Sequence, residues 1–332
     1  MRFSRYAATI VHAVLVTTSL AGVLSCESVL AESKLKALIV TGQGLHGWRD
    51  SSSDFQTLLE KSGRFEVKIS QSPAPNAKSD NWESWNPVFS DYDVVVLEYS
   101  GDEWPERLRT ALQDFVHDGG GMFLAHSVVG AFDEWPEYED MIGIGWNRSS
   151  AGARIIYDEE VDDFLYLPRY HGAGAGHGKQ HEFAVTARSL EHPIMKDLPP
   201  VWMQAQDELY HGMRGPAKDM EILATAFSDA SLWGSANHEP VVWTVNYGQG
   251  RIVVTVLGHR MADDFQYDPE QHELDHGANG TSAVHSVGFQ TLVLRGCEWA
   301  ATGEVTTRVP AKFPTLESVS VIPPSDVDWR IE

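Results

Sequence analysis

The sequence predicts an α/β protein built as a three-layer sandwich, with helices on both faces of a mostly parallel sheet. Short β-rich runs alternate with segments of helical periodicity, and several of the runs are apolar nearly throughout. Such continuous runs are typical of parallel strands covered on both faces, whereas half-exposed antiparallel strands alternate polar and apolar residues. The runs interpreted as strands are residues 37–41, 65–70, 94–99, 122–126, 183–187, 222–226, 241–246 and 252–257.

Three segments show the period of helices. Residues 54–61 carry apolar side chains at helical spacing before the stop at Gly63, and residues 108–116 do so before three consecutive glycines. The last predicted helix runs from about residue 284 to residue 301. Because 332 residues with 42% hydrophobic content can bury a large core, we expect one α/β domain over residues 32–306. An extended, proline-rich tail over residues 307–332 would follow it.

The first 31 residues have the pattern of an export signal. Arg2 and Arg5 precede an apolar run, and small residues follow it. Cleavage before Glu32 would release the mature chain, whereas residues 23–26 match a lipobox that would leave a lipid anchor on Cys26. Both alternatives predict an exported protein, in the periplasm, outside the cell or anchored at the envelope, with no transmembrane segment in the mature chain.

Composition excludes some partners and reactions. The 47 acidic residues outnumber the 25 basic ones, and the formal net charge of -22 argues against a nucleic-acid partner. Only two cysteines are present, and one of them lies in the export segment, so no internal disulfide is expected. Cys297 lies in an apolar pattern and is interpreted as a buried small side chain rather than a nucleophile.

The first predicted strand ends in a glycine-rich turn over residues 41–48. Gly42, Gly44 and Gly47 have the G-x-G-x-x-G spacing of a phosphate-binding turn, but glycines alone are a weak signal and no lysine follows to hold phosphate, so no nucleotide cofactor is expected. The glycines instead let the backbone bend and project His46 and Trp48 over the strand ends. An aromatic ring beside an imidazole suits a sugar, although Trp48 can equally cover the rim of the core.

His126 comes at the carboxyl end of the predicted strand 122–126. Ligands bind at this edge in open α/β sheets, which favours a functional role over that of a packed core histidine.

The chain resembles the ThuA-like trehalose-utilisation proteins, which share the class I glutamine amidotransferase-like fold. The resemblance covers nearly the whole mature chain and rests on a series of segments rather than on one motif. These segments are residues 37–40 with His46 and Trp48, 92–96, 115–126, 135–138, 142–143, 192–194, 207–210, 247–251, 257–259, 288–289 and 295–301. The resemblance implies a flavodoxin-like sheet and a role in carbohydrate metabolism. It also implies substrates that are sugars oxidised to the 3-keto form.

One departure from the amidotransferases excludes their chemistry. Their catalytic strand end presents a cysteine nucleophile, whereas residues 124–128 of this chain contain none, so the protein is not expected to be a glutaminase. Attack by Ser127 with His126 as base is disfavoured, because adjacent residues at a strand end point to opposite sides.

The resemblance places His46, His126, Glu208 and His259 at one edge of the sheet, where they are the predicted catalytic residues. Imidazole and carboxylate groups together suit proton transfer. In a 3-keto-sugar the carbonyl acidifies the hydrogen on C2, so a base can remove it and expel the C1 substituent. Either His126 or Glu208 is the expected base, and the other, or His259, the expected acid.

The same four residues are candidate ligands for a divalent metal such as zinc, although their scatter along the chain leaves this open. Residues 272–276 match the zinc-protease pattern H-E-x-x-H, but a polar loop context argues against the helix that this motif needs. The glycine-rich segment with His171, His177 and His181 is interpreted as an exposed loop or, alternatively, as a lid that reaches the substrate.

Trp48, Asp207, Tyr210 and Trp146 are the predicted substrate-binding residues, with Trp135 as a further aromatic candidate. Asp207 and Glu208 have an alternative interpretation as a surface acid pair. The sequence therefore predicts an exported enzyme of sugar catabolism that acts by acid/base elimination or hydrolysis on a glycoside or 3-keto-sugar. The alternative is a sugar-binding or accessory protein with the same fold and no turnover.

Overall fold

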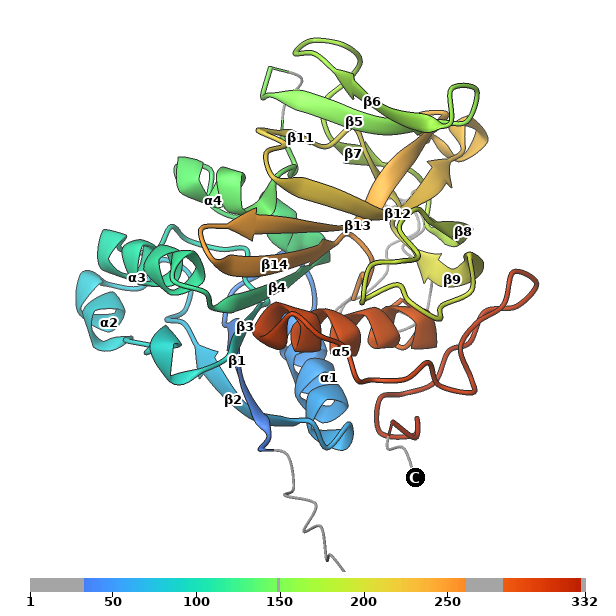
Figure 1. Cartoon of the computed structure of the whole chain (residues 1–332). Helices are drawn as coiled ribbons and strands as arrows, with labels where there is room; N and C mark the ends of the chain where they lie inside the picture. Colours follow the sequence, from blue (N-terminus) through green and yellow to red (C-terminus); the bar gives the residue numbers. More distant parts are fainter. Residues whose placement is uncertain (1–32, 148–149, 261–282, 330–332) are drawn as a thin grey trace, which may run out of the picture. The chain divides into compact units, whose positions relative to one another are not determined.

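The computed structural model describes residues 33–147, 150–260 and 283–329 (Figure 1). Lys34–Glu332 form one compact unit. The predicted export segment, with Cys26, and the H-E-x-x-H pattern at residues 272–276 lie outside the described residues.

Five parallel strands form the first half of the sheet and confirm the predicted fold class. They pair in the order β2-β1-β3-β4-β14, and every neighbouring pair among them is parallel. Their carboxyl ends therefore lie at one edge. The strands are β1 (Leu35–Thr41), β2 (Phe65–Gln71), β3 (Val94–Leu97), β4 (Gly121–Ala125) and β14 (Gly250–Thr255).

The second half of the same sheet is antiparallel. Beyond β14 the order continues β13 (Asn237–Tyr247), β12 (Met220–Ser228), β8 (His181–Ala187) and β9 (Val201–Asp207), each antiparallel to its neighbour. The sequence pattern had favoured parallel pairing here. The observed orientation differs from this expectation because the central strands β12 and β13 are buried along most of their length. Burial on both faces produces a continuous apolar run in parallel and antiparallel strands alike.

Shorter strands extend this half and were not predicted. A ribbon of β5 (Ala153–Asp158) and β6 (Asp163–Leu167) joins the sheet through β13, and β11 (Arg214–Gly215) pairs with β5. Separately, β7 (Gly176–His177) pairs with β10 (Tyr210–His211).

Helices cover the sheet, and α5 (Val287–Thr302) is the most deeply buried of them. It packs on β4, β14 and β3 and also contacts α1 (Trp48–Lys61), which lies on β1 and β2 (Figure 1). The other helices are α2 (Ser79–Ser84), α3 (Glu106–His117) and α4 (Pro136–Ile142), with 3-10 turns η1 (Phe89–Asp91), η2 (His126–Gly130) and η3 (Ala230–Leu232). Both α3 and α4 contact β14.

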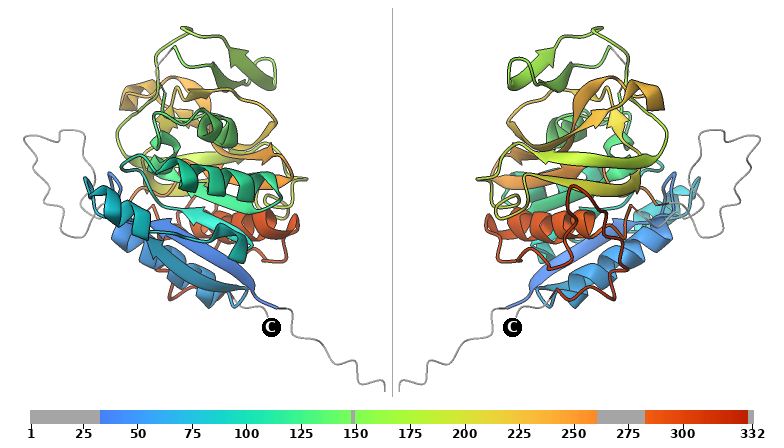
Figure 2. Two further views of the ribbon diagram at one scale, coloured as in Figure 1. Left: turned by 90° about the vertical axis from the view of Figure 1, so that its left-hand side faces the viewer. Right: turned by 90° about the vertical axis from the view of Figure 1, so that its right-hand side faces the viewer.

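The segment after α5 runs along the surface without a helix of its own, as the right-hand view of Figure 2 shows. Val327 and Trp329 near its end are nevertheless buried. Among the described residues, no helix combines the length and the apolar character needed to cross a bilayer.

Candidate active site

The structure brings together the four predicted catalytic residues. His126 directly follows β4, Glu208 directly follows β9, and His46 and His259 lie in the loops after β1 and β14. One ring nitrogen of each histidine and one carboxylate oxygen of Glu208 all lie within 4.8 Å of one another. We call these four residues the histidine–glutamate cluster.

His126 has a backbone conformation that suits its position at a strand end. Its φ is +53°, a left-handed value that non-glycine residues adopt only at a cost. Its Nδ1 lies 2.9 Å from the carbonyl oxygen of Val256, and since a carbonyl only accepts, Nδ1 carries a proton. Nε2 faces Tyr210 Oη at 3.0 Å and Glu208 Oε2 at 3.4 Å. Neither ring nitrogen is therefore directed at Ser127, which agrees with the expectation against a serine nucleophile.

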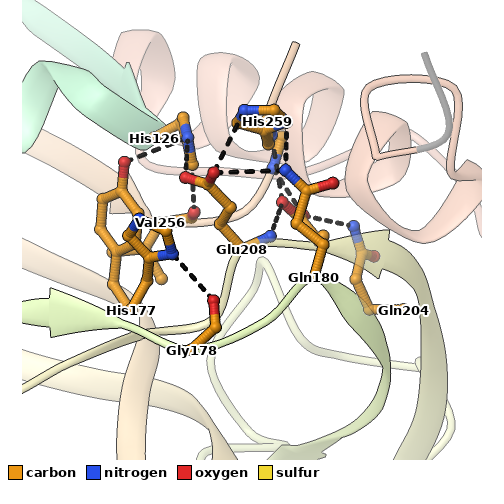
Figure 3. Close-up of polar contacts among 11 residues, drawn as sticks. His126, His177, Gly178, Gln180, Gln204, Glu208, Val256 and His259 are labelled. Carbon is orange, nitrogen blue, oxygen red and sulfur yellow. Dashed lines mark hydrogen bonds and ion pairs between the residues drawn. The ribbon is translucent and has the colours of Figure 1, made fainter. Parts of the chain in front are cut away.

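Glu208 lies between two imidazoles (Figure 3). Its Oε2 is 3.4 Å from His126 Nε2, its Oε1 is 3.3 Å from His259 Nε2, and the Gln180 side-chain amide donates to Oε1 at 3.2 Å. Burial raises the pKa of Glu208, but hydrogen bonding to His126 and the charges of the nearby histidines outweigh burial and hold it well below its usual range. For His126, burial lowers the pKa, and the Glu208 carboxylate more than reverses this effect.

Asp207 is an anchor for the site rather than a substrate ligand, which corrects the sequence-based expectation. Its side chain is fully buried. One carboxylate oxygen accepts hydrogen bonds from the backbone N–H groups of Glu208 and His259, and the other from Gly258 N–H and the Gln204 side chain. The carboxylate thus ties the end of β9 to the loop after β14, although the two strands are not neighbours in the sheet.

A cavity of about 280 Å³ opens beside the histidine–glutamate cluster. The pairing of β7 with β10 sets His177 opposite Tyr210. The ring of Trp146, 40% exposed, lies edge-on to Tyr210 with centroids 4.7 Å apart. The residues that line the cavity are Leu45, His46, Ser127, Gly130, Trp146, His177, Glu208 and Tyr210.

Other aromatic and histidine candidates lie elsewhere. Trp48 is not among the lining residues, and the Arg49 guanidinium covers its ring at 4.1 Å. Trp135 is a core side chain. Of His171, His177 and His181, only His177 lines the cavity. Gln180 of the same segment contacts Glu208 and His259, so this predicted loop does reach the site.

Glu98 is a neighbour of the site that sequence reasoning missed. It follows β3, between the strands that deliver His46 and His126, and accepts a hydrogen bond from Ser51 Oγ at 2.6 Å. Burial raises its pKa to about 7, although the Ser51 hydroxyl and the charge of His126 act in the opposite direction. Its position directly after an apolar run, the same signal that singled out His126, was sufficient to find it.

A family model described as "ThuA: Trehalose utilisation" matches residues 36–300. The chain belongs to the ThuA family. A crystal structure of a ThuA-like protein from Parabacteroides merdae is 36% identical, with a TM-score of 0.79 over 90% of this chain and 100% of that one.

A second ThuA-like structure, from Bacteroides uniformis, is 18% identical and has a TM-score of 0.51 over 83% of this chain and 95% of that one. At that identity it supports the fold alone. No curated protein matches the chain significantly. Membership of the ThuA family indicates a role connected with carbohydrate utilisation.

Proposed function

We propose that this ThuA protein is an exported enzyme of carbohydrate catabolism that acts by acid/base chemistry on a glycoside or a 3-keto-sugar. The observation that carries the proposal is the convergence of three imidazoles and one carboxylate beside a cavity at the carboxyl edge of the sheet. The family description, trehalose utilisation, supports a sugar substrate.

The proposed reaction begins with loss of the C2 proton of a 3-keto-glycoside. The electrons of the C2–H bond form a C1=C2 double bond as the C1–O bond breaks, and the departing oxygen takes up a proton. Water can then add across the double bond, which gives net hydrolysis. His126 and Glu208 are close enough to share these transfers, one as base and the other, or His259, as acid.

The cavity has the size and the lining for one sugar ring. Its volume of about 280 Å³ is just below the range of about 300–1,000 Å³ typical of ligand pockets, as a single sugar ring requires. The partly exposed indole of Trp146 offers an apolar face to a pyranose, and Tyr210 and His177 offer polar groups on the same wall. We assign Tyr210 and Trp146 to substrate binding.

Export is part of the proposal and rests on the pattern of the first 31 residues. Cell fractionation combined with mass spectrometry of the mature N-terminus distinguishes release before Glu32 from lipid attachment at Cys26. A full-length chain that remains in the cytoplasm would contradict export without affecting the proposed chemistry.

The catalytic proposal is tested by incubating the purified protein with trehalose, sucrose and their 3-keto derivatives. We expect products from a 3-keto-glycoside, and a loss of at least about 100-fold in rate for His126→Ala, because removing a positioned acid or base typically costs 10²–10⁴-fold. His181→Ala serves as the matched control, since His181 does not line the cavity. Sugar binding without turnover of any of the four compounds would instead indicate a sugar-binding or accessory protein.

A further inference from the structure

We propose that the histidine–glutamate cluster binds one divalent transition-metal cation of the zinc class. Its ligands would be one ring nitrogen from each of His46, His126 and His259 and the Glu208 carboxylate. Imidazole nitrogens with one carboxylate are a ligand set that zinc and related ions prefer. The site itself is inferred from geometry, and only the role of the cation in catalysis rests on the proposed function.

Distances support a shared cation. Ligands that lie 2.0–2.1 Å from a zinc ion at tetrahedral angles are about 3.4 Å from one another. The contacts of Glu208 with His126 Nε2 and His259 Nε2 are 3.4 and 3.3 Å. A charge-assisted N–H···O hydrogen bond is shorter, about 2.7–2.9 Å. These two separations match ligands of one ion better than direct proton-sharing pairs, and the ligand atoms of the whole cluster, which lie within 4.8 Å of one another, would draw closer together around the ion.

The tautomer of His126 supports the same conclusion. Because Nδ1 donates to the Val256 carbonyl oxygen, the lone pair of a neutral His126 is on Nε2, which faces the Glu208 carboxylate at 3.4 Å and the Tyr210 hydroxyl at 3.0 Å. A cation between Nε2 and the carboxylate would take up this lone pair in place of the Tyr210 proton. A backbone carbonyl that holds the distal N–H is also the usual way in which proteins orient a metal-binding imidazole.

The arrangement of the rings points to one central charge. The ring centroids of His46, His126 and His259 lie 4.7 to 5.2 Å apart. Filling the cluster with protons would place imidazolium cations beside one another, where like charges repel. One dication neutralises the carboxylate and lets all three rings remain neutral, and the formal net charge of -22 favours its capture.

Such a cation would be accessible to substrate. Of the four proposed ligands, His46 and Glu208 line the cavity, so a sugar oxygen in the cavity can reach the ion in place of Glu208, which leaves three imidazole ligands. As a Lewis acid, the ion would polarise a 3-keto carbonyl, and the displaced Glu208 would be free to act as the base that takes the C2 proton. The hydroxyl of Tyr210, on the same wall, would then be placed to hydrogen-bond the sugar.

Metal binding can be measured without any sugar. Untagged protein is stripped with a chelator, dialysed and titrated with Zn²⁺ and Co²⁺, with the metal content determined by elemental analysis. We expect one tightly bound ion per chain and a change in the visible spectrum of Co²⁺. His46→Ala and Glu208→Gln should each weaken binding at least about 100-fold, since even the loss of a residue that only hydrogen-bonds a metal ligand costs about 10–100-fold.

His177→Ala is the matched control, because His177 lines the same cavity but lies outside the cluster. It should bind within about twofold of the wild type. His46 lies in a loop and is only partly buried, so its replacement carries the least risk to folding, which circular dichroism will check. The absence of saturable binding by folded wild-type protein would overturn the proposal. Equal affinity in the wild type, His46→Ala and Glu208→Gln would also overturn it.

The two proposals fail in different ways. Metal binding that depends on the cluster, with no conversion of any 3-keto-sugar, would remove the proposed function and leave the metal site. Full turnover by metal-free protein would overturn the catalytic role of the cation and leave the acid/base reaction.

Discussion

At the scale of single residues, the site depends on a histidine in a backbone conformation that favours glycine. The left-handed φ of His126 turns its ring away from the strand and toward Val256 and Glu208. Strain of this kind costs about 1–3 kcal/mol and is characteristic of functional positions. The proposed role of His126 in proton transfer would account for a histidine at a position that favours glycine.

This conformation predicts an unusual order of stability. His126→Gly should be more stable than His126→Ala by about 1 kcal/mol, because alanine keeps the left-handed strain whereas glycine does not. Urea denaturation of the two variants measures the difference. At ordinary strand or helix positions glycine is the less stable of the two, so that usual order would contradict the conformation described here.

A second prediction concerns Glu98 and pH. Its pKa is raised from 4.5 to about 7 in the folded protein, so the folded state binds the proton more tightly than the unfolded state. The contribution of Glu98 to stability is therefore lost as pH rises from about 4.5 to 7, by at most about 3 kcal/mol. Glu98→Gln should remove this pH dependence, and the difference in unfolding free energy between wild type and variant, measured at pH 5 and pH 8, checks it. An unchanged difference would contradict the burial of this carboxyl group.

At the scale of elements, the site is formed by the segments that follow β1, β4, β9 and β14, and hydrogen bonds of Asp207 connect the last two of these. The sequence pattern located β1, β4 and β14 and hence the positions of His46, His126 and His259, because each of these strands is a continuous apolar run. It did not locate β9, in which Gln204, Gln206 and Asp207 interrupt the apolar pattern. The role of Asp207 depends on backbone contacts far apart in the sequence, which no local pattern contains.

The Asp207 anchor leads to a prediction for the β9–β14 connection. Asp207→Asn replaces one accepting oxygen with an N–H₂ group that faces N–H donors, so we expect a loss of about 2–3 kcal/mol in unfolding free energy. Turnover should fall mainly through kcat, because His259 loses its backbone support. Thermal denaturation and steady-state kinetics together test this prediction. A raised KM with unchanged stability would instead restore Asp207 as a substrate ligand.

At the scale of the whole molecule, the buried helix α5 fixes the parallel half of the sheet. The sequence predicted this helix and the α/β class from composition and periodicity, because both depend on local pattern. It did not predict the antiparallel half, since strand orientation is decided by pairing that an apolar run such as β12 or β13 does not encode. The close packing of α5 on β4 also depends on contacts between segments far apart in the sequence, so no local pattern predicts it.

Gly121 allows that approach. A Cβ on Gly121 would lie 2.6 Å from the backbone carbonyl carbon of Ala300, and backbone cannot move aside as a side chain can. Gly121→Ala should therefore push α5 from the sheet and cost about 3 kcal/mol or more, as overpacking does. Its melting temperature, compared with that of the wild type, tests the packing, and an unchanged value would contradict it.

The central claim is that the histidine–glutamate cluster acts on the C2 hydrogen of a keto-sugar, and hydrogen exchange tests it most directly. A 3-keto-glycoside is incubated with the protein in D₂O, and deuterium at C2 of the remaining substrate and in the product is followed by mass spectrometry. The account predicts deuterium incorporation with wild-type protein and with His181→Ala, and a loss of at least about 100-fold with Glu208→Gln. Incorporation no faster than in buffer alone, or equally fast with Glu208→Gln, would contradict it.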